Sequence, residues 1–103
     1  MSATILIVDD DLLVLESLED YLKQADYRVV TASSAREAIE KGRETPFDIG
    51  LLDMKMPEMD GFQVAAMLRQ LQPGLRIIIF TGYASLESEA RAAQLDFYEY
   101  LPK

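Results

Sequence analysis

The 103-residue chain contains no cysteine and no histidine. The absence of cysteine excludes disulfides, thiolate zinc sites and cysteine nucleophiles. The absence of histidine excludes Ser-His catalytic triads, histidine-ligated metals and histidine general bases. The side chains left to hold a metal ion therefore offer oxygen ligands.

Basic residues and long apolar runs are also scarce. Ten basic residues against eighteen acidic ones give a net charge of −8. A field of that sign repels the phosphates of nucleic acid and anionic lipid, so we expect no direct binding to either. No stretch approaches the roughly 20 apolar residues that span a bilayer, and the first residues lack the basic start of a signal peptide. We therefore expect a cytoplasmic protein.

The composition is that of a folded domain, with 50% hydrophobic and 27% charged residues. A chain of this length forms one domain, which we expect over residues 1–103. Short runs that are apolar on both faces are typical of strands in parallel sheets. Such runs lie at residues 5–8, 28–32, 49–52 and 77–80, and a more alternating, aromatic segment at 97–101 indicates a strand nearer the edge.

Helical patterns separate these runs. Apolar residues recur at three- and four-residue steps within 15–25, 62–71 and 86–93, and the segment from Ser34 to Glu37 is a capping box that starts a further helix. Pro73 and Gly74 stop the third of these four helices. Strand and helix thus alternate four times before a last strand, which predicts an α/β fold with a parallel sheet and right-handed crossovers.

Polar residues follow the ends of the predicted strands. Three aspartates, 9–11, follow the first strand, Asp53 follows the third, Thr81 and Gly82 follow the fourth, and Lys103 follows the fifth. Ligands of open parallel sheets bind beyond the carboxyl ends of the strands, so these groups should converge on one edge. Asp11 is best explained as the N-cap of the first helix.

The predicted cluster suits a phosphoryl group. Neighbouring carboxylates repel one another and favour a cation, and with oxygen ligands the natural cation is Mg²⁺. Asp53 would be the nucleophile and form an acyl phosphate. Thr81 and the backbone N–H of Gly82 would donate hydrogen bonds to phosphoryl oxygens, and Lys103 would pair with the remaining ones.

Four segments in this order resemble the receiver domain of bacterial two-component response regulators. They are ILIVDDD at 5–11, LLDMKMPEMDG at 51–61, FTGYA at 80–84 and YLPK at 100–103. The resemblance implies a flavodoxin-like, doubly wound parallel sheet of five strands in the order 2-1-3-4-5, with four helices. The family continues into a fifth helix, which this sequence lacks, so we expect a receiver domain shortened at its C-terminus and belonging to a longer protein.

The resemblance also assigns roles. Asp53 would be the phosphoacceptor and Asp10 a direct ligand of Mg²⁺ or Mn²⁺, while Asp9 would bind the metal through water. Lys55 would offer its backbone carbonyl to the metal, and Tyr100 would be the switch aromatic that moves with Thr81. The donor would be a phosphohistidine on a sensor histidine kinase or a phosphotransfer protein. Homodimers are compatible with this class.

Three alternative functions compete with this one. A phosphatase of the haloacid-dehalogenase type is disfavoured because Lys55 stands where that family has a second aspartate. A flavodoxin-like phosphate-binding module is disfavoured because the loop after the first strand is triply acidic. A pseudo-receiver that serves protein contacts alone stays open. The sequence best supports the hypothesis of a phosphorylation-dependent signalling switch. We expect the switch to assist its own phosphotransfer and dephosphorylation but not to be otherwise an enzyme.

Overall fold

The computed structural model describes residues 3–53, 61–81 and 98–102. For residues 80–81 and 98–102 it describes the backbone alone. Its centre is a five-stranded sheet in the order β2-β1-β3-β4-β5. Every neighbouring pair is parallel. The strands are β1 Thr4–Val8, β2 Arg28–Ala32, β3 Ile49–Leu52, β4 Arg76–Thr81 and β5 Tyr98–Pro102. The predicted sheet and its strand order are confirmed.

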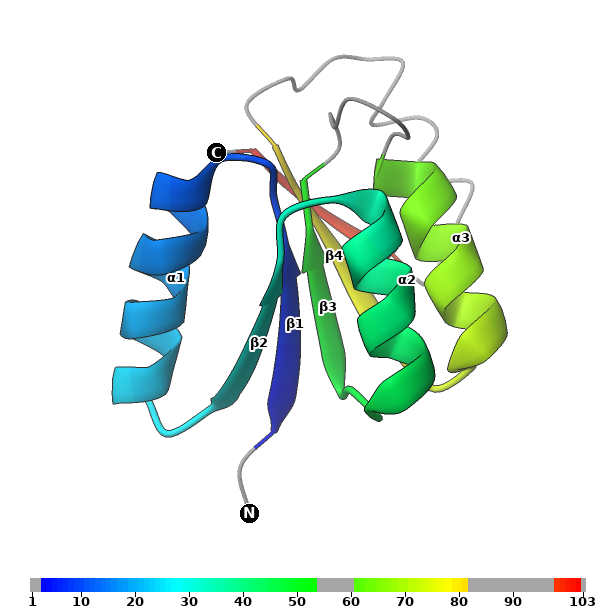
Figure 1. Cartoon of the computed structure of the whole chain (residues 1–103), viewed down its shortest axis with the longest axis horizontal. Coiled ribbons are helices and arrows are strands. Elements are labelled where there is room, and N and C mark those ends of the chain that lie inside the picture. Colours follow the sequence, from blue (N-terminus) through cyan, green and yellow to red (C-terminus); the bar gives the residue numbers. More distant parts are fainter. Residues whose placement is uncertain (1–2, 54–60, 82–97, 103) are drawn as a thin grey trace.

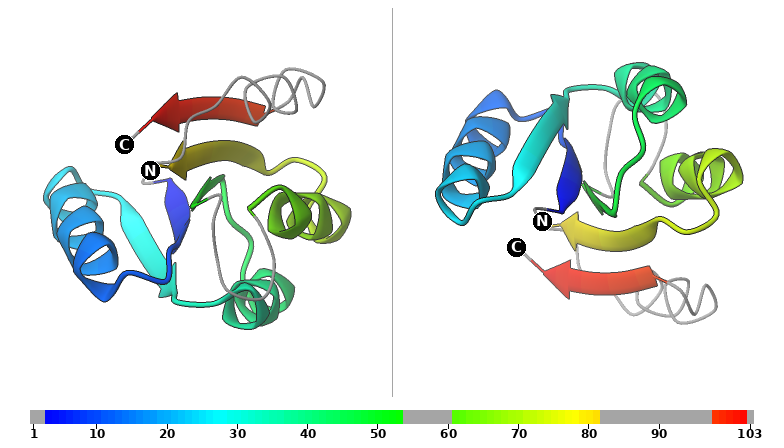
Figure 2. Two further views of the ribbon diagram at one scale, coloured as in Figure 1. Left: turned by 90° about the horizontal axis from the view of Figure 1, so that it is seen from above. Right: turned by 90° about the horizontal axis from the view of Figure 1, so that it is seen from below.

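Three helices accompany the sheet in the described residues: α1 Leu12–Gln24, α2 Ala35–Glu44 and α3 Gly61–Leu71. α1 lies on one face of the sheet, and α2 and α3 lie side by side on the other (Figures 1 and 2). The helix predicted over 86–93 lies outside the described residues, and the absence of a fifth helix stays a prediction. No helix in the described ranges has the length and apolarity needed to cross a bilayer.

Helix starts follow the caps expected from the sequence. The carboxylate of Asp11 accepts hydrogen bonds from the backbone N–H of Leu13 at 3.0 Å and of Val14 at 3.4 Å, and so satisfies two free donors of α1. The Ser34 hydroxyl accepts from the Glu37 N–H at 3.1 Å in the same way at α2. The other half of the expected capping box differs, since the Glu37 carboxylate accepts from the Ser33 hydroxyl at 3.2 Å.

Alternate residues of the strands enter two separate cores. One face packs against α2 and α3 and includes Leu6, Val8, Leu52, Ile77 and Ile79. The other face packs against α1 through Ile5 and Ile7 together with Leu15, Leu18 and Leu22 of the helix. Because both faces of β1 are buried, its register is fixed, and so is the place where the aspartates after Val8 emerge.

The contact between α2 and α3 depends on Gly42. A Cβ atom at this position would lie 2.6 Å from Cδ2 of Leu68, which is itself fully buried. We expect Gly42→Ala to lower the free energy of unfolding by about 1 kcal/mol, because overpacking costs about 1–3 kcal/mol and the gain in helix propensity returns about 1 kcal/mol. Urea unfolding measures this difference.

Gly74 provides the matched control for that substitution. It lies in the turn between α3 and β4, and no atom lies within 4 Å of a Cβ built there. Gly74→Ala should leave stability unchanged or slightly raised. Equal stability of the two alanine variants would show that the helices do not depend on the close approach at Gly42.

Candidate phosphoacceptor and metal site

Asp53 lies directly after β3 at the carboxyl edge of the sheet. Its backbone N–H donates to the Val8 carbonyl at 2.8 Å, which continues the pairing of β3 with β1 one residue beyond the strand. The residue is 7% exposed. The sheet therefore fixes the backbone of Asp53, and the residue is mostly shielded from solvent.

Asp9 occupies the equivalent position after β1. Its backbone N–H donates to the Ala32 carbonyl at 3.2 Å, so it is tied to β2 as Asp53 is tied to β1. It is 2% exposed, and its carboxylate accepts the Asp11 N–H at 3.0 Å. Asp9 thus shapes the turn into α1 in addition to presenting a charge. The sequence did not indicate this second role.

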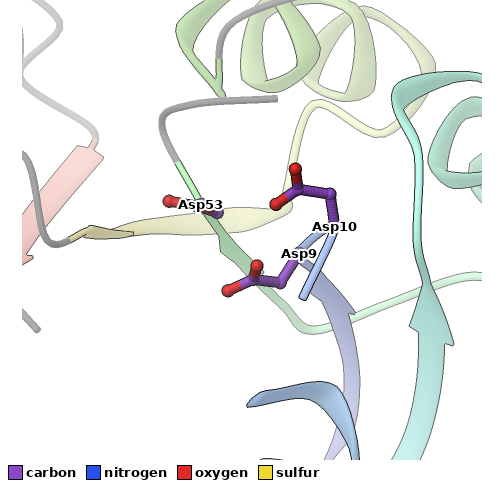
Figure 3. A group of neighbouring side chains, drawn as sticks. All are labelled: Asp9, Asp10 and Asp53. Atoms are coloured by element: carbon purple, nitrogen blue, oxygen red, sulfur yellow. The ribbon is translucent and has the colours of Figure 1, made fainter. Parts of the chain in front are cut away.

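Asp10 completes the cluster from the exposed side of the same turn. One carboxylate oxygen from each of Asp9, Asp10 and Asp53 lies within 4.8 Å of the others. Figure 3 shows the three side chains gathered where β1 and β3 end. The convergence predicted from the strand ends is confirmed for these three residues.

The cluster is electrostatically costly without a counter-charge. Two unit charges about 4 Å apart repel by on the order of 4 kcal/mol at an effective dielectric constant near 20. Asp9 and Asp53 are also the buried acidic residues of the described chain, so water screens them poorly. A bound cation would offset the repulsion among the three carboxylates.

The donor set fits a hard divalent cation. Mg²⁺ binds oxygen ligands at about 2.1 Å, so two direct ligands of one ion lie roughly 3–4 Å apart, and ligands that act through water lie farther. The 4.8 Å limit on the three carboxylate oxygens is compatible with one hydrated ion that takes both kinds of ligand. The chain offers neither a cysteine thiolate nor a histidine imidazole to favour a softer metal.

Among the remaining predicted site residues, the structure describes the backbone of Thr81 and Tyr100, on the two strands beyond β3. Leu52 pairs with Ile79, and Thr81 pairs with Pro102, so β4 and β5 end on the side of the sheet where β3 ends. Thr81 is the last residue of β4, and Tyr100 lies within β5 opposite Ile79. The side chains of Thr81 and Tyr100, and all of Lys55, Gly82 and Lys103, lie outside the described residues.

Comparison with known proteins identifies the class. Residues 5–103 match the family model of the response regulator receiver domain. The chain therefore belongs to the receiver domain family, the phosphorylation-dependent switch modules of two-component signalling.

Individual relatives agree with this assignment. The chain is 37% identical over 99 residues to the transcriptional regulatory protein ZraR of Escherichia coli strain K12. The matched region covers 96% of this chain and 22% of that protein. It is 31% identical over 99 residues to the cell cycle response regulator CtrA of Brucella ovis, covering 96% of this chain and 43% of that one. The chain thus spans less than half the length of these curated relatives.

Solved structures share the fold over the whole chain. A CheY-like receiver domain protein from Methanospirillum hungatei superposes with a TM-score of 0.88 at 34% identity, covering 100% of this chain and 84% of that one. The response regulator TrrA of Thermotoga maritima, solved in complex with Mg²⁺ and BeF, gives a TM-score of 0.86 at 32% identity and covers 100% of this chain and 87% of that one. The flavodoxin-like fold is confirmed.

Proposed function

We propose that this chain accepts a phosphoryl group on Asp53 from the phosphohistidine of a sensor histidine kinase or phosphotransfer protein, in a Mg²⁺-dependent reaction. The observation that carries the proposal is the meeting of the Asp9, Asp10 and Asp53 carboxylates at the carboxyl edge of the sheet. An oxygen of Asp53 attacks phosphorus, the bond from phosphorus to the donor imidazole breaks, and an acyl phosphate forms. The leaving imidazole takes up a proton from solvent.

Asp9, Asp10, Asp53 and the backbone carbonyl of Lys55 would hold Mg²⁺ or Mn²⁺. When bound, the metal supplies positive charge that neutralises the carboxylates and the phosphoryl oxygens. Two fixed features of this chain support the arrangement. Backbone hydrogen bonds to β2 and β1 hold Asp9 and Asp53, respectively, and the Asp9 carboxylate is further held by the Asp11 N–H.

In the same proposal Thr81, Gly82 and Lys103 bind the phosphoryl oxygens, and Tyr100 moves with Thr81 to carry the signal. The new acceptor oxygens would bias two arrangements of the segment after β4. Receiver domains are regulatory phosphoacceptors, and we propose that this one acts as the input module of a longer cytoplasmic response regulator without further enzymatic activity.

The test uses acetyl phosphate, a small donor that needs no partner protein. Incubation with acetyl phosphate and Mg²⁺ should add the mass of one phosphoryl group to the intact chain, and chelation of the metal with EDTA should prevent it. An unmodified chain in the presence of Mg²⁺ would contradict the proposal and would favour a pseudo-receiver.

A further inference from the structure

The outer face of α3 carries no charge, although the chain as a whole carries −8. The helix buries Phe62, Val64, Ala65 and Leu68 in the core between itself, α2 and the sheet. The side chains on its solvent side are uncharged and recur at positions i, i+3, i+4, i+7 and i+8, so they form one stripe along the helix. We call this set the α3 outer stripe; its members are Gln63, Ala66, Met67, Gln70 and Leu71.

The composition of this stripe differs from the rest of the surface. Met67 is 37% and Leu71 41% exposed, and their spacing of four residues makes them neighbours on the helix. Residues 61–75 contain no acidic residue and one basic residue, Arg69, whose guanidinium donates to the Leu75 carbonyl at 2.6 Å. α1 and α2 each contain three acidic residues. Exposed apolar side chains with no charge among them are typical of the core of a protein interface.

We propose that the α3 outer stripe is the contact between two copies of this chain, with the two helices packed antiparallel about a twofold axis at Met67. A twofold contact brings a patch against its own copy, so the patch has to be self-complementary. An acidic patch would repel its copy, whereas glutamine amides both donate and accept hydrogen bonds and can pair with one another. Met67 and Leu71 supply the apolar area that the contact removes from water.

Charge at the two ends of α3 favours the antiparallel arrangement. The helix begins near the carboxyl edge of the sheet, where the three carboxylates gather, and ends near the amino edge (Figure 1). Arg69 lies in its last turn, and Arg76 is the first residue of β4. Antiparallel packing places the acidic edge of one copy beside the basic end of α3 in the other, and it also opposes the helix dipoles. Parallel packing would bring the two acidic clusters together.

Other occupants match the stripe less well. Nucleic acid and anionic lipid are held by basic residues, and the α3 outer stripe contains none. A partner with a charged surface would bury charges that the stripe cannot pair, which is costly. The second copy avoids both penalties. The proposal concerns association alone and does not depend on phosphorylation of Asp53.

Disulfide crosslinking tests the contact and its orientation, because the chain has no cysteine of its own. A disulfide forms where two Cα atoms lie within about 7 Å. Oxidised Met67→Cys should therefore give a covalent dimer about tenfold faster than Gln63→Cys or Leu71→Cys, since only residue 67 meets its own copy. A mixture of Gln63→Cys with Leu71→Cys should give the mixed dimer. Tyr21→Cys is the control for random collision, because Tyr21 is 71% exposed but lies on α1, on the other face of the sheet (Figure 2).

Sedimentation equilibrium measures the same contact on the unmodified chain. One helix from each copy makes an interface at the small end of the known range, so we expect a weak dimer with a Kd on the order of 0.1 mM. Met67→Lys should raise this Kd at least about tenfold, because two like charges then meet at the axis. Thermal unfolding of each variant checks that the fold is retained.

Three results would overturn the proposal. They are a wild type that stays monomeric up to about 1 mM, a Met67→Lys variant that dimerises as tightly as the wild type, and a Tyr21→Cys variant that crosslinks as fast as Met67→Cys. Rapid crosslinking of Gln63→Cys and of Leu71→Cys, each with its own copy, would contradict the antiparallel arrangement. Asp53→Asn should dimerise like the wild type, which separates this test from that of the proposed function.

Discussion

Asp53→Asn should reduce phosphorylation by acetyl phosphate to background, a loss of at least about 10³-fold, because the amide lacks the nucleophilic carboxylate oxygen. Asparagine has nearly the same shape as aspartate, and the backbone bond from residue 53 to the Val8 carbonyl does not depend on the side chain. The fold should therefore survive the substitution. Intact mass and a phosphate-affinity gel measure the loss, with thermal unfolding as the check on structure.

Asp11→Asn is the matched control for this experiment. Asp11 neighbours the site but lies outside the carboxylate cluster, and its role is to cap α1. Asparagine caps helices as well as aspartate does, so the control should be labelled at the wild-type rate. Label that persists on Asp53→Asn would place the acceptor elsewhere.

We expect saturating Mg²⁺ to stabilise the wild type by about 2.7 kcal/mol at 100 times its Kd, which for a domain of this size raises Tm by roughly 12 °C. Asp10→Asn should remove most of this shift, because it takes away one charged ligand of the predicted set. Without metal the same variant should melt above the wild type, since it relieves repulsion among three neighbouring carboxylates.

The opposite sign of the effect with and without metal is the diagnostic feature of that experiment. Thermal unfolding followed by circular dichroism, in EDTA and in Mg²⁺, measures both. Asp11→Asn again serves as the control and should behave like the wild type in each condition. A wild type whose Tm is indifferent to Mg²⁺ would contradict the metal site.

Much of this site could be predicted from the sequence because its geometry follows from the topology. The carboxyl ends of adjacent parallel strands share one edge, so aspartates directly after β1 and β3 had to meet once the strands were correctly placed. The caps at Asp11 and Ser34 were also predictable, since each depends on residues within one turn of helix.

Features that depend on distant contacts could not be predicted. Gln72 precedes Pro73 and Gly74 and looks like an ordinary turn residue. Its amide accepts the Phe47 N–H at 2.8 Å and donates to the carbonyls of Gly42 and Thr45 at 2.8 and 2.7 Å. These bonds join the ends of α2 and α3 between residues that lie 25 to 30 positions apart in the sequence. No local sequence pattern predicts them.

Glycines gave a similarly incomplete signal. Gly50 lies inside β3, and its neighbours in the sequence do not explain why a glycine stands there. The structure shows the reason, because a Cβ at position 50 would lie 3.1 Å from Cδ1 of Leu52 and 3.2 Å from Cδ1 of Ile77. Side chains of the sheet itself, rather than a helix, fill the space that a larger residue would need.

The most direct test of the account locates the phosphoryl group chemically. An aspartyl phosphate is an acyl phosphate, and borohydride reduces it to the alcohol of homoserine, which marks the modified position permanently. After labelling with acetyl phosphate and Mg²⁺, peptide mass spectrometry of the reduced chain should find homoserine at position 53 and aspartate at positions 9 and 10. Homoserine at another position, or a phosphoryl group that resists reduction because a hydroxyl carries it, would contradict the assignment of Asp53 as the acceptor.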